Sequence, residues 1–381
     1  MPKVLVVDDS ALMRRLITGV LGNAGFEVIT ARTGTEGVER LTEWQPDVVT
    51  LDINMPEMDG ITALSLMMQA RPTPVVMVSS LTEKGAQATF EALALGAVDY
   101  IAKPGGTISL SVDEISEQLI AKVRAAARAR LRGRPSATGQ GLGSATSPGA
   151  SAGSGLASSG SARPAPSPSR VPLQPKPFAA APKFAVGRPP GLVLIGVSTG
   201  GPRTLEDILP ALPEHFPWPI LVAQHMPSSF TSAFAKRMDS LCRLTVRECD
   251  DTMPLEAGHI YIGRGGGDMA VVERLGRLAV QPRPETPGHL WHPSVDVLVD
   301  SAMRAMPPQQ LVGIQLTGMG NDGARAMAEL RRQGGRTIAE SEDTAVVFGM
   351  PSELIDLGGA TIVLPCTGVA RQLCHWVQPL H

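Results

Sequence analysis

Short, continuous apolar runs alternate with amphipathic segments in both halves of this 381-residue chain, and this alternation constrains the fold most strongly. An apolar run without polar interruptions is typical of a strand that is buried on both faces. Such strands, separated by helices, predict a parallel sheet with helices on both sides. We therefore expect an α/β protein with two doubly wound parallel-sheet sandwich domains. The runs are 4–7, 47–51, 74–78, 98–101, 192–195, 219–222, 311–316 and 361–364.

A segment of different composition separates the two sets of apolar runs. Residues 133–190 consist mainly of Ala, Gly, Ser and Pro and contain no Asp or Glu. A segment of this kind cannot bury enough apolar surface to offset the entropy lost on ordering. We expect a long, disordered linker over 133–190 that joins a domain at 1–132 to a second domain at 191–381.

The composition excludes several classes of protein. The chain has 34 Lys+Arg against 36 Asp+Glu, a net charge of −2, which argues against a dedicated nucleic-acid binder. No apolar run approaches the roughly 18–20 residues of a membrane span, and the N-terminus leads into a strand-like run rather than a signal peptide. The four cysteines lack CxxC spacing, which favours reduced, buried thiols. We expect a cytoplasmic protein that is not embedded in a membrane.

Polar residues follow the predicted strands of the N-terminal half. Asp8 and Asp9 close the first strand, Asp52 and Ser79 close two others, and Lys103 follows the last. Functional groups collect at the carboxyl ends of strands in doubly wound sheets. Each residue alone is weak support for a site, since strand ends are often Asp or Ser for turn reasons. Three carboxylates together would repel one another unless they bound a divalent cation, and hard oxygen ligands suit Mg²⁺.

In the C-terminal half, a glycine-rich turn follows the strand 192–196 and precedes a helix-like stretch at 204–212. This layout is compatible with a phosphate-binding loop, but GxGxxG and a P-loop lysine are both missing. The turn also fits G-x-S-x-G with Ser198 at its centre, which indicates a nucleophile elbow. So short a match also arises by chance.

A nucleophilic serine needs a base and an acid that orients the base. His225 directly follows the strand that ends at Gln224, and Asp322 follows the strand 311–316. We therefore expect Ser198, His225 and Asp322 at the carboxyl ends of three strands in one sheet. Their order along the chain differs from the Ser–Asp–His order of α/β-hydrolases, but geometry rather than order defines a triad. His289 and His292 flank a loop and are interpreted as surface or substrate-rim residues.

Three motifs of the N-terminal half resemble the receiver domain of two-component response regulators over about 3–124. They are Val7-Asp8-Asp9-Ser10, the segment 51–60 around Asp52, and Lys103-Pro104. The resemblance implies a flavodoxin-like domain in which Asp52 accepts a phosphoryl group and binds Mg²⁺ together with Asp8 and Asp9. It also implies that Ser79 binds a phosphoryl oxygen and that Lys103 pairs with its charge. Tyr100 stands at the position of the family's aromatic switch, although a core tyrosine fits the sequence equally well.

The C-terminal half resembles the protein-glutamate methylesterase domain of the CheB family of bacterial chemotaxis, which implies a Rossmann-like esterase domain. The matching segments are 198–201, 224–227, 292–296, 316–324 and 347–351. The resemblance implies that Ser198 is the nucleophile, His225 the general base and Asp322 the orienting acid. It places the Met319 backbone N–H and the Thr199 side chain around the oxyanion.

From this resemblance we expect a phosphorylation-activated hydrolase. It would remove methyl esters from glutamate side chains of methyl-accepting chemotaxis receptors, release methanol, and also deamidate receptor glutamines. The expected phosphodonor is the histidine kinase CheA, Mg²⁺ would serve the receiver, and ester hydrolysis would need no cofactor. Two rival functions fit less well. A DNA-binding response regulator would carry a short basic output domain, and a non-catalytic scaffold would have lost the triad.

Overall fold

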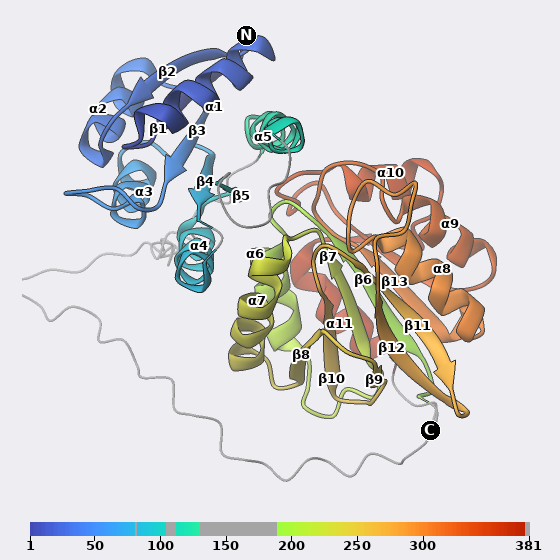
Figure 1. The fold of residues 1–381 in the computed structure, drawn as a ribbon. Helices are drawn as coiled ribbons and strands as arrows, with labels where there is room; N and C mark the ends of the chain where they lie inside the picture. The colour runs from blue at the N-terminus through green and yellow to red at the C-terminus, as the bar shows by residue number, and fades with distance from the viewer. Residues whose placement is uncertain (81, 104–111, 130–188, 378–381) are drawn as a thin grey trace, which may run out of the picture. The chain divides into compact units, whose positions relative to one another are not determined.

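The structure of the protein is a computed structural model that describes residues 1–80, 82–103, 112–129 and 189–377 (Figure 1). The predicted linker, 133–190, lies outside the described residues except for its last two positions. The parts of the chain on either side of it form separate sheets.

The N-terminal part contains a five-stranded parallel sheet in the order β2-β1-β3-β4-β5. This order is that of the flavodoxin-like doubly wound fold. Its elements are β1 (Lys3–Val7), α1 (Ala11–Asn23), β2 (Glu27–Ala31), α2 (Gly34–Trp44), β3 (Val48–Asp52), α3 (Gly60–Ala70), β4 (Val75–Ser79), α4 (Glu83–Leu95), β5 (Asp99–Ala102) and α5 (Val112–Ala126).

Side-chain caps fix where four of these helices begin. Ser10, Thr33, Asp59 and Thr82 precede α1, α2, α3 and α4, and each side chain accepts a hydrogen bond from the backbone N–H three residues later. Such a cap satisfies one of the free N–H groups of the first turn and typically contributes about 1 kcal/mol. The caps start helices shortly after the strands and leave the strand ends free to carry polar side chains.

The C-terminal part contains a seven-stranded parallel sheet in the order β15-β14-β13-β6-β7-β10-β8. Its strands are β6 (Leu192–Val197), β7 (Ile220–Gln224), β8 (Thr245–Cys249), β10 (His259–Gly263), β13 (Leu311–Gln315), β14 (Arg336–Glu340) and β15 (Ile362–Leu364). The helices are α6 (Gly201–Ile208), α7 (Ser228–Leu241), α8 (Val295–Ala305), α9 (Ala324–Arg332), α10 (Met350–Asp356) and α11 (Cys366–Val377), with short 3₁₀ turns at Leu209–Ala211 and Pro308–Gln310.

Helices cover both faces of this sheet (Figure 1). The apolar side chains of α6, α7 and α11 belong to one buried cluster, and those of α8, α9 and α10 belong to another on the opposite face. Strand β6 has β13 on one side and β7 on the other, and the chain winds outward from it in both directions. Such a switch in winding opens a crevice at the carboxyl ends of the strands, where ligands bind. The predicted α/β class with two doubly wound sheets is confirmed.

Two details differ from the prediction. The helix expected at 204–212 begins at Gly201 and ends at Ile208, because Pro202 fits the first turn and Pro210 cannot donate the next helical hydrogen bond. A three-stranded antiparallel sheet, β11 (Asp268–Arg274), β12 (Arg277–Arg283) and β9 (Met253–Pro254), was not expected. Its hairpin turns through Leu275 and Gly276, both at positive φ, and Gly276 is the residue type that favours this geometry.

The described part of the chain contains no helix of the length and apolar character required to cross a membrane. No disulfide joins the four cysteines, all of which lie in the described ranges; Cys242, Cys249 and Cys366 are buried, and Cys374 is half-buried. Burial raises the pKa of Cys249 to about 12, so this thiol stays protonated and unreactive at neutral pH.

Candidate functional site

The parallel register of β6 and β7 brings Ser198 and His225 together. Val197 and Gln224 are paired as the last residues of the two strands, and His225 N–H donates to the Val197 carbonyl at 3.0 Å. Ser198 N–H donates to the Thr317 carbonyl at 2.9 Å, on the loop that follows β13. Ser198 therefore lies between the end of β7 and the loop that leads to Asp322.

Glycines are required in the turn that carries Ser198. Gly200 has φ of +79°, and a Cβ on Gly201 would lie 2.1 Å from the Gln224 Oε1 atom. The Gln224 side chain in turn donates to the Ser198 carbonyl at 3.0 Å. Across the crevice, a Cβ on Gly318 would lie 2.7 Å from the Ser198 Cβ. A larger residue at 201 would therefore displace the Gln224 side chain, and a larger residue at 318 would displace Ser198.

Asp322 lies at the N-terminus of α8 and accepts four hydrogen bonds. Its Oδ2 atom accepts from His225 Nε2 at 2.9 Å and from Val295 N–H at 2.7 Å. Its Oδ1 atom accepts from the Ser294 hydroxyl at 2.9 Å and from Asp296 N–H at 3.1 Å. Burial opposes ionisation, but the hydrogen bonds and the His225 side chain hold the pKa of Asp322 below its ordinary value of 3.8. Asp322 is therefore an anion at neutral pH.

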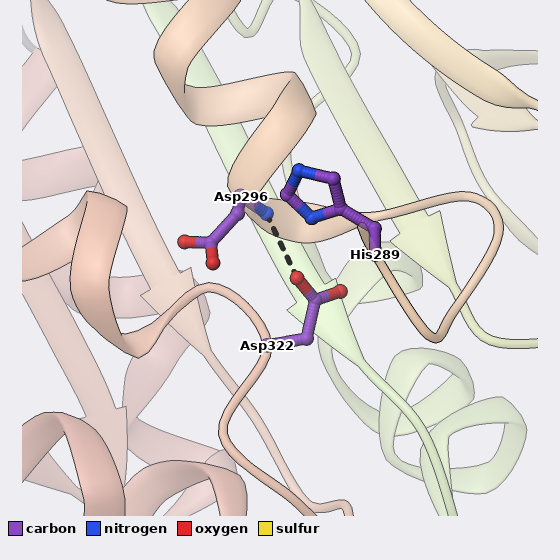
Figure 2. Close-up of side chains that lie close together, drawn as sticks. All are labelled: His289, Asp296 and Asp322. Carbon is purple, nitrogen blue, oxygen red and sulfur yellow. Dashed lines mark hydrogen bonds between the residues drawn. The ribbon is translucent and has the colours of Figure 1, made fainter. Parts of the chain in front are cut away.

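Helices α8 and α9 hold each other's N-termini through two aspartates. Figure 2 shows the Asp296 backbone N–H directed at the Asp322 carboxylate. In the other direction, Asp296 Oδ1 accepts from Ala326 N–H in the first turn of α9 at 3.0 Å. Since Gly323 provides no side-chain cap for α9, Asp296 supplies the acceptor instead. This reciprocal arrangement fixes the position of Asp322 relative to the sheet.

His289 extends the hydrogen-bond network on the side away from His225. Its Nδ1 atom lies 3.1 Å from the Ser294 hydroxyl. The Ser294 proton is used toward Asp322, an acceptor only, so His289 Nδ1 must be the donor to Ser294. Asp322, Asp296 and His289 lie close enough to suggest a metal site (Figure 2). Four protein donors already fill the Asp322 lone pairs, however, and we interpret the cluster as a hydrogen-bond network.

The His225 ring is oriented by Asp322. Because the carboxylate can only accept, Nε2 carries the proton and Nδ1 has the free lone pair. The Nδ1 atom is buried and lacks a hydrogen-bond partner within the described ranges. Ser198 is half-buried, and its hydroxyl makes no hydrogen bond to His225 within these ranges. Catalytic hydrogen bonds are often long before substrate binds. The site therefore has an oriented base with its basic nitrogen available beside a serine.

The loop after β13 contains Met319 and is held from behind by the segment 347–350. Gly318 N–H donates to the Val347 carbonyl at 3.0 Å, and the Gly318 carbonyl accepts from Gly349 and Met350. Met319 N–H has no backbone partner among the residues that the structure describes. Thr199 is buried, and its carbonyl accepts from the Thr317 hydroxyl at 2.9 Å. The two residues expected around the oxyanion thus lie on the two loops that enclose Ser198.

The N-terminal sheet carries a separate acidic pocket. Asp8, Asp9 and Asp52 have carboxylate oxygens within 4.8 Å of one another, and Lys103 Nζ lies 2.7 Å from Asp52 Oδ2 and 3.4 Å from Asp8 Oδ2. Burial raises the pKa of both Asp8 and Asp52, against the opposing influence of Lys103. Three carboxylates and one ammonium leave an excess of two negative charges. A hard divalent cation such as Mg²⁺ fits this donor set.

Ser79 and Tyr100 lie close to this pocket in the sheet, at the end of β4 and in β5. The Ser79 side chain is buried and donates to the Gly85 carbonyl at 3.2 Å. Tyr100 is buried as well, which raises the pKa of its hydroxyl. Lys122 of α5 lies 2.9 Å from the Asp99 carboxylate and 4.8 Å from the Tyr100 ring centroid. The structure thus brings Asp8, Asp9, Asp52, Ser79 and Lys103 to one edge of the sheet.

Sequence reasoning missed several residues around Asp322. Ser294, which caps α8 and donates to Asp322, carried a readable signal, because a serine after proline and before an apolar run is typical of a helix start. His289 and His292 were expected at the surface or the rim. Both are half-buried, and the His292 Nδ1 atom lies 3.0 Å from the buried Asp268 carboxylate. Trp291 stacks on His225, a contact that no sequence pattern indicates.

Fold and site together define the class as a two-part α/β protein, with a receiver-like acidic pocket and a hydrolase-like Ser–His–Asp cluster. Residues 4–112 match the response regulator receiver domain family, and residues 193–373 match the CheB methylesterase family. Protein-glutamate methylesterase/protein-glutamine glutaminase 3 of Rhodospirillum rubrum is 53% identical over 99% of this chain and 97% of that protein. Protein-glutamate methylesterase/protein-glutamine glutaminase 2 of Rhodopseudomonas palustris is 48% identical, and the match covers 99% of this chain and 98% of that protein. The chain belongs to the CheB family of protein-glutamate methylesterase/protein-glutamine glutaminases.

One solved structure of a CheB methylesterase resembles part of this chain in sequence. The catalytic domain of the Thermotoga maritima CheB methylesterase is 38% identical in sequence, with a TM-score of 0.48, and the match covers 49% of this chain and 98% of that one.

Proposed function

We propose that Ser198, His225 and Asp322 are the catalytic residues of a methylesterase that also deamidates glutamine. The observation that carries the proposal is the 2.9 Å contact from His225 Nε2 to Asp322, with Ser198 beside His225 at the ends of paired strands. An ionised, hydrogen-bonded carboxylate that orients an imidazole next to a serine is the arrangement that acyl transfer requires.

In the proposed mechanism, the Ser198 oxygen attacks the carbonyl carbon of a glutamyl side chain while His225 Nδ1 takes the serine proton. Asp322 stabilises the resulting imidazolium through Nε2. The proton then passes to the departing methoxide, or to the amide nitrogen of a glutamine, so that methanol or ammonia leaves. Water, activated by the same nitrogen, releases the carboxylate and restores Ser198.

The oxyanion of the tetrahedral intermediate needs donors that are already in place. We assign this role to Met319 N–H and the Thr199 side chain, which lie on the two loops around Ser198. Loss of one such donor typically lowers kcat by about 10²–10³-fold. Gly318 supports this assignment, because the absence of a side chain there lets the Met319 loop approach Ser198 closely. We propose that hydrolysis uses no cofactor.

The N-terminal domain is proposed to control the esterase by phosphorylation. Asp52 would accept the phosphoryl group, and Asp8, Asp9 and Asp52 would hold Mg²⁺, which neutralises phosphoryl oxygens when bound. Lys103 would pair with the phosphoryl charge, Ser79 would bond one of the phosphoryl oxygens, and Tyr100 would act as the aromatic switch. A chemotaxis histidine kinase, CheA, is the proposed phosphodonor.

We propose methyl-accepting chemotaxis receptors as the substrates and the cytoplasm as the location. We also propose a receiver domain at 1–132, a linker at 133–190 and a catalytic domain at 191–381. The decisive experiment measures methanol release from receptor membranes that carry tritiated methyl esters, with and without acetyl phosphate. Wild-type enzyme should release methanol faster with the phosphodonor, and Ser198→Ala should release none above background. Release by Ser198→Ala within a few-fold of wild type would contradict the assignment.

A further inference from the structure

An aromatic ring covers one face of the His225 imidazole. Trp291 stacks on it with the ring centroids 5.2 Å apart and the planes 8° from parallel. The His225 side chain is 3% exposed, whereas Leu290, the residue before Trp291, is 79% exposed. Trp291 therefore lies where the chain turns from solvent onto the candidate base. Asp322 contacts the edge of the same ring, so the two residues act on His225 from different directions.

The segment that carries Trp291 is tied down on both sides. The buried Asp268 carboxylate, at the start of β11, accepts from Thr286 N–H and Ser294 N–H, each at 2.8 Å, and contacts His292 Nδ1 at 3.0 Å. Burial opposes ionisation, but these hydrogen bonds lower the pKa of Asp268 below its ordinary value. Three bonds to one carboxylate, from residues before and after Trp291, hold the indole in place over His225.

The stack favours one protonation state of His225. The face of an indole ring is electron-rich and attracts a cation within about 6 Å, more strongly when water is excluded. The indole face attracts the positively charged imidazolium form of His225 much more strongly than the neutral imidazole form. In the proposed mechanism His225 gains a positive charge when it accepts the serine proton, so the contact would stabilise the transition state more than the state before proton transfer.

The ionisable groups that hydrogen bonds and ion pairs link to His225 in the described ranges lie on the Asp322 side of its ring. Asp322, on the loop before α9, touches the ring at Nε2. Behind it are Asp296 of α8, with Arg325 of α9 3.5 Å from that carboxylate, and His289, which reaches Asp322 through Ser294. All of these act through the Asp322 edge of the imidazole.

We propose that Trp291 is a positioning residue for His225 that stabilises its protonated form during acyl transfer. The inference rests on the proposed role of His225 as the base. The proton that leaves the Ser198 hydroxyl binds His225 Nδ1 as the serine oxygen bonds to the ester carbon. The same proton leaves with methoxide as methanol when the carbon–methoxide bond breaks. Trp291 exchanges no atom or electron in either step.

Two substitutions separate the electronic contribution of the ring from its volume. In Trp291→Leu the leucine fills part of the space but has no aromatic face. In Trp291→Phe the phenyl ring keeps an aromatic face that attracts a cation less strongly than indole does. For Trp291→Leu we expect a roughly tenfold lower kcat with little change in KM, and an acid limb of the kcat/KM profile about one pH unit lower. Trp291→Phe should fall between this variant and wild type. A matched control, Trp218→Phe in the same domain, should leave rate and profile unchanged.

A second measurement does not depend on hydrolysis. A protonated imidazole quenches the fluorescence of an indole that it contacts, so Trp291 emission should fall as His225 becomes protonated. The sequence has four tryptophans, and subtracting the emission of Trp291→Phe from that of wild type isolates Trp291. The difference should change with pH in wild type, and the change should be lost in a His225→Ala background.

The outcomes distinguish this inference from the proposed function. If His225→Ala is inactive while Trp291→Leu keeps the wild-type rate and acid limb, the role of Trp291 is refuted and the triad stands. If His225→Ala keeps wild-type activity, the triad is refuted and the inference with it. A lower kcat in Trp291→Leu with an unchanged acid limb also refutes the inference, because packing alone would then explain the loss.

Discussion

Substitution of Asp322 by asparagine tests how one carboxylate can serve both the fold and the chemistry. Four donors converge on Asp322, two on each oxygen. In the Asp322→Asn variant an amide NH₂ replaces one oxygen and faces two donors, which lose their acceptor. Each buried donor left unsatisfied costs about 1–3 kcal/mol. The negative charge at the N-terminus of α8 is lost as well, which costs a further ~0.3–1 kcal/mol.

We therefore expect Asp322→Asn to lower the free energy of unfolding by about 3 kcal/mol at neutral pH. The pKa of Asp322 is lowered in the folded state from its ordinary value of 3.8. The ionised carboxylate therefore stabilises the fold at pH values above 3.8. That stabilisation is lost as the pH falls through the folded-state pKa. The difference in stability between wild type and variant should accordingly shrink below about pH 4.

The activity of the same variant should fall much further than its stability. The introduced side chain can present its amide NH₂ to His225, which favours the wrong tautomer, and it cannot stabilise imidazolium. A comparable change in a serine protease triad lowers kcat by about 10⁴. Urea denaturation across the pH range and methanol release at neutral pH measure the two effects. Asp300→Asn is the matched control, since Asp300 is a partly exposed residue of α8 paired with Arg325, and it should change stability by less than about 1 kcal/mol. Wild-type stability in Asp322→Asn, or activity within tenfold, would refute this account of the carboxylate.

Three further predictions concern the other assigned groups. His225→Ala should reduce methanol release to the background of Ser198→Ala. Because triad members act as a unit, the variant that carries both substitutions should be no slower than either single variant. A double variant that is much slower than both single variants would contradict this. Asp52→Asn should abolish activation by acetyl phosphate while basal methanol release continues, and stoichiometric labelling of this variant with radioactive acetyl phosphate would show that another residue accepts the phosphoryl group. Iodoacetamide at pH 7 should leave Cys249 unmodified and methanol release unchanged in the folded enzyme, since burial raises the pKa of this thiol to about 12; mass spectrometry of tryptic peptides measures the labelling.

Much of this protein could be predicted from local pattern alone. Strands buried on both faces are continuous apolar runs, so 192–195 and 311–316 indicate a covered parallel sheet without any knowledge of their partners. The carboxyl ends of such strands meet at one edge, and residues that directly follow them, such as Ser198 and His225, are therefore expected together. The antiparallel hairpin was missed because its turn, through Leu275 and Gly276, resembles no common turn dipeptide.

Only the tertiary structure showed how these residues are held. Asp322 is oriented by the N-terminus of α8, Asp296 caps α9 in return, and His289 reaches the carboxylate through Ser294. Trp291 covers His225 from a segment 66 positions further along the chain. Periodicity records whether a residue faces a core, but it carries no information on which distant side chain it meets there. These contacts depend on the direction of individual side chains and on the path of an irregular loop, which are set by packing between segments remote in the sequence.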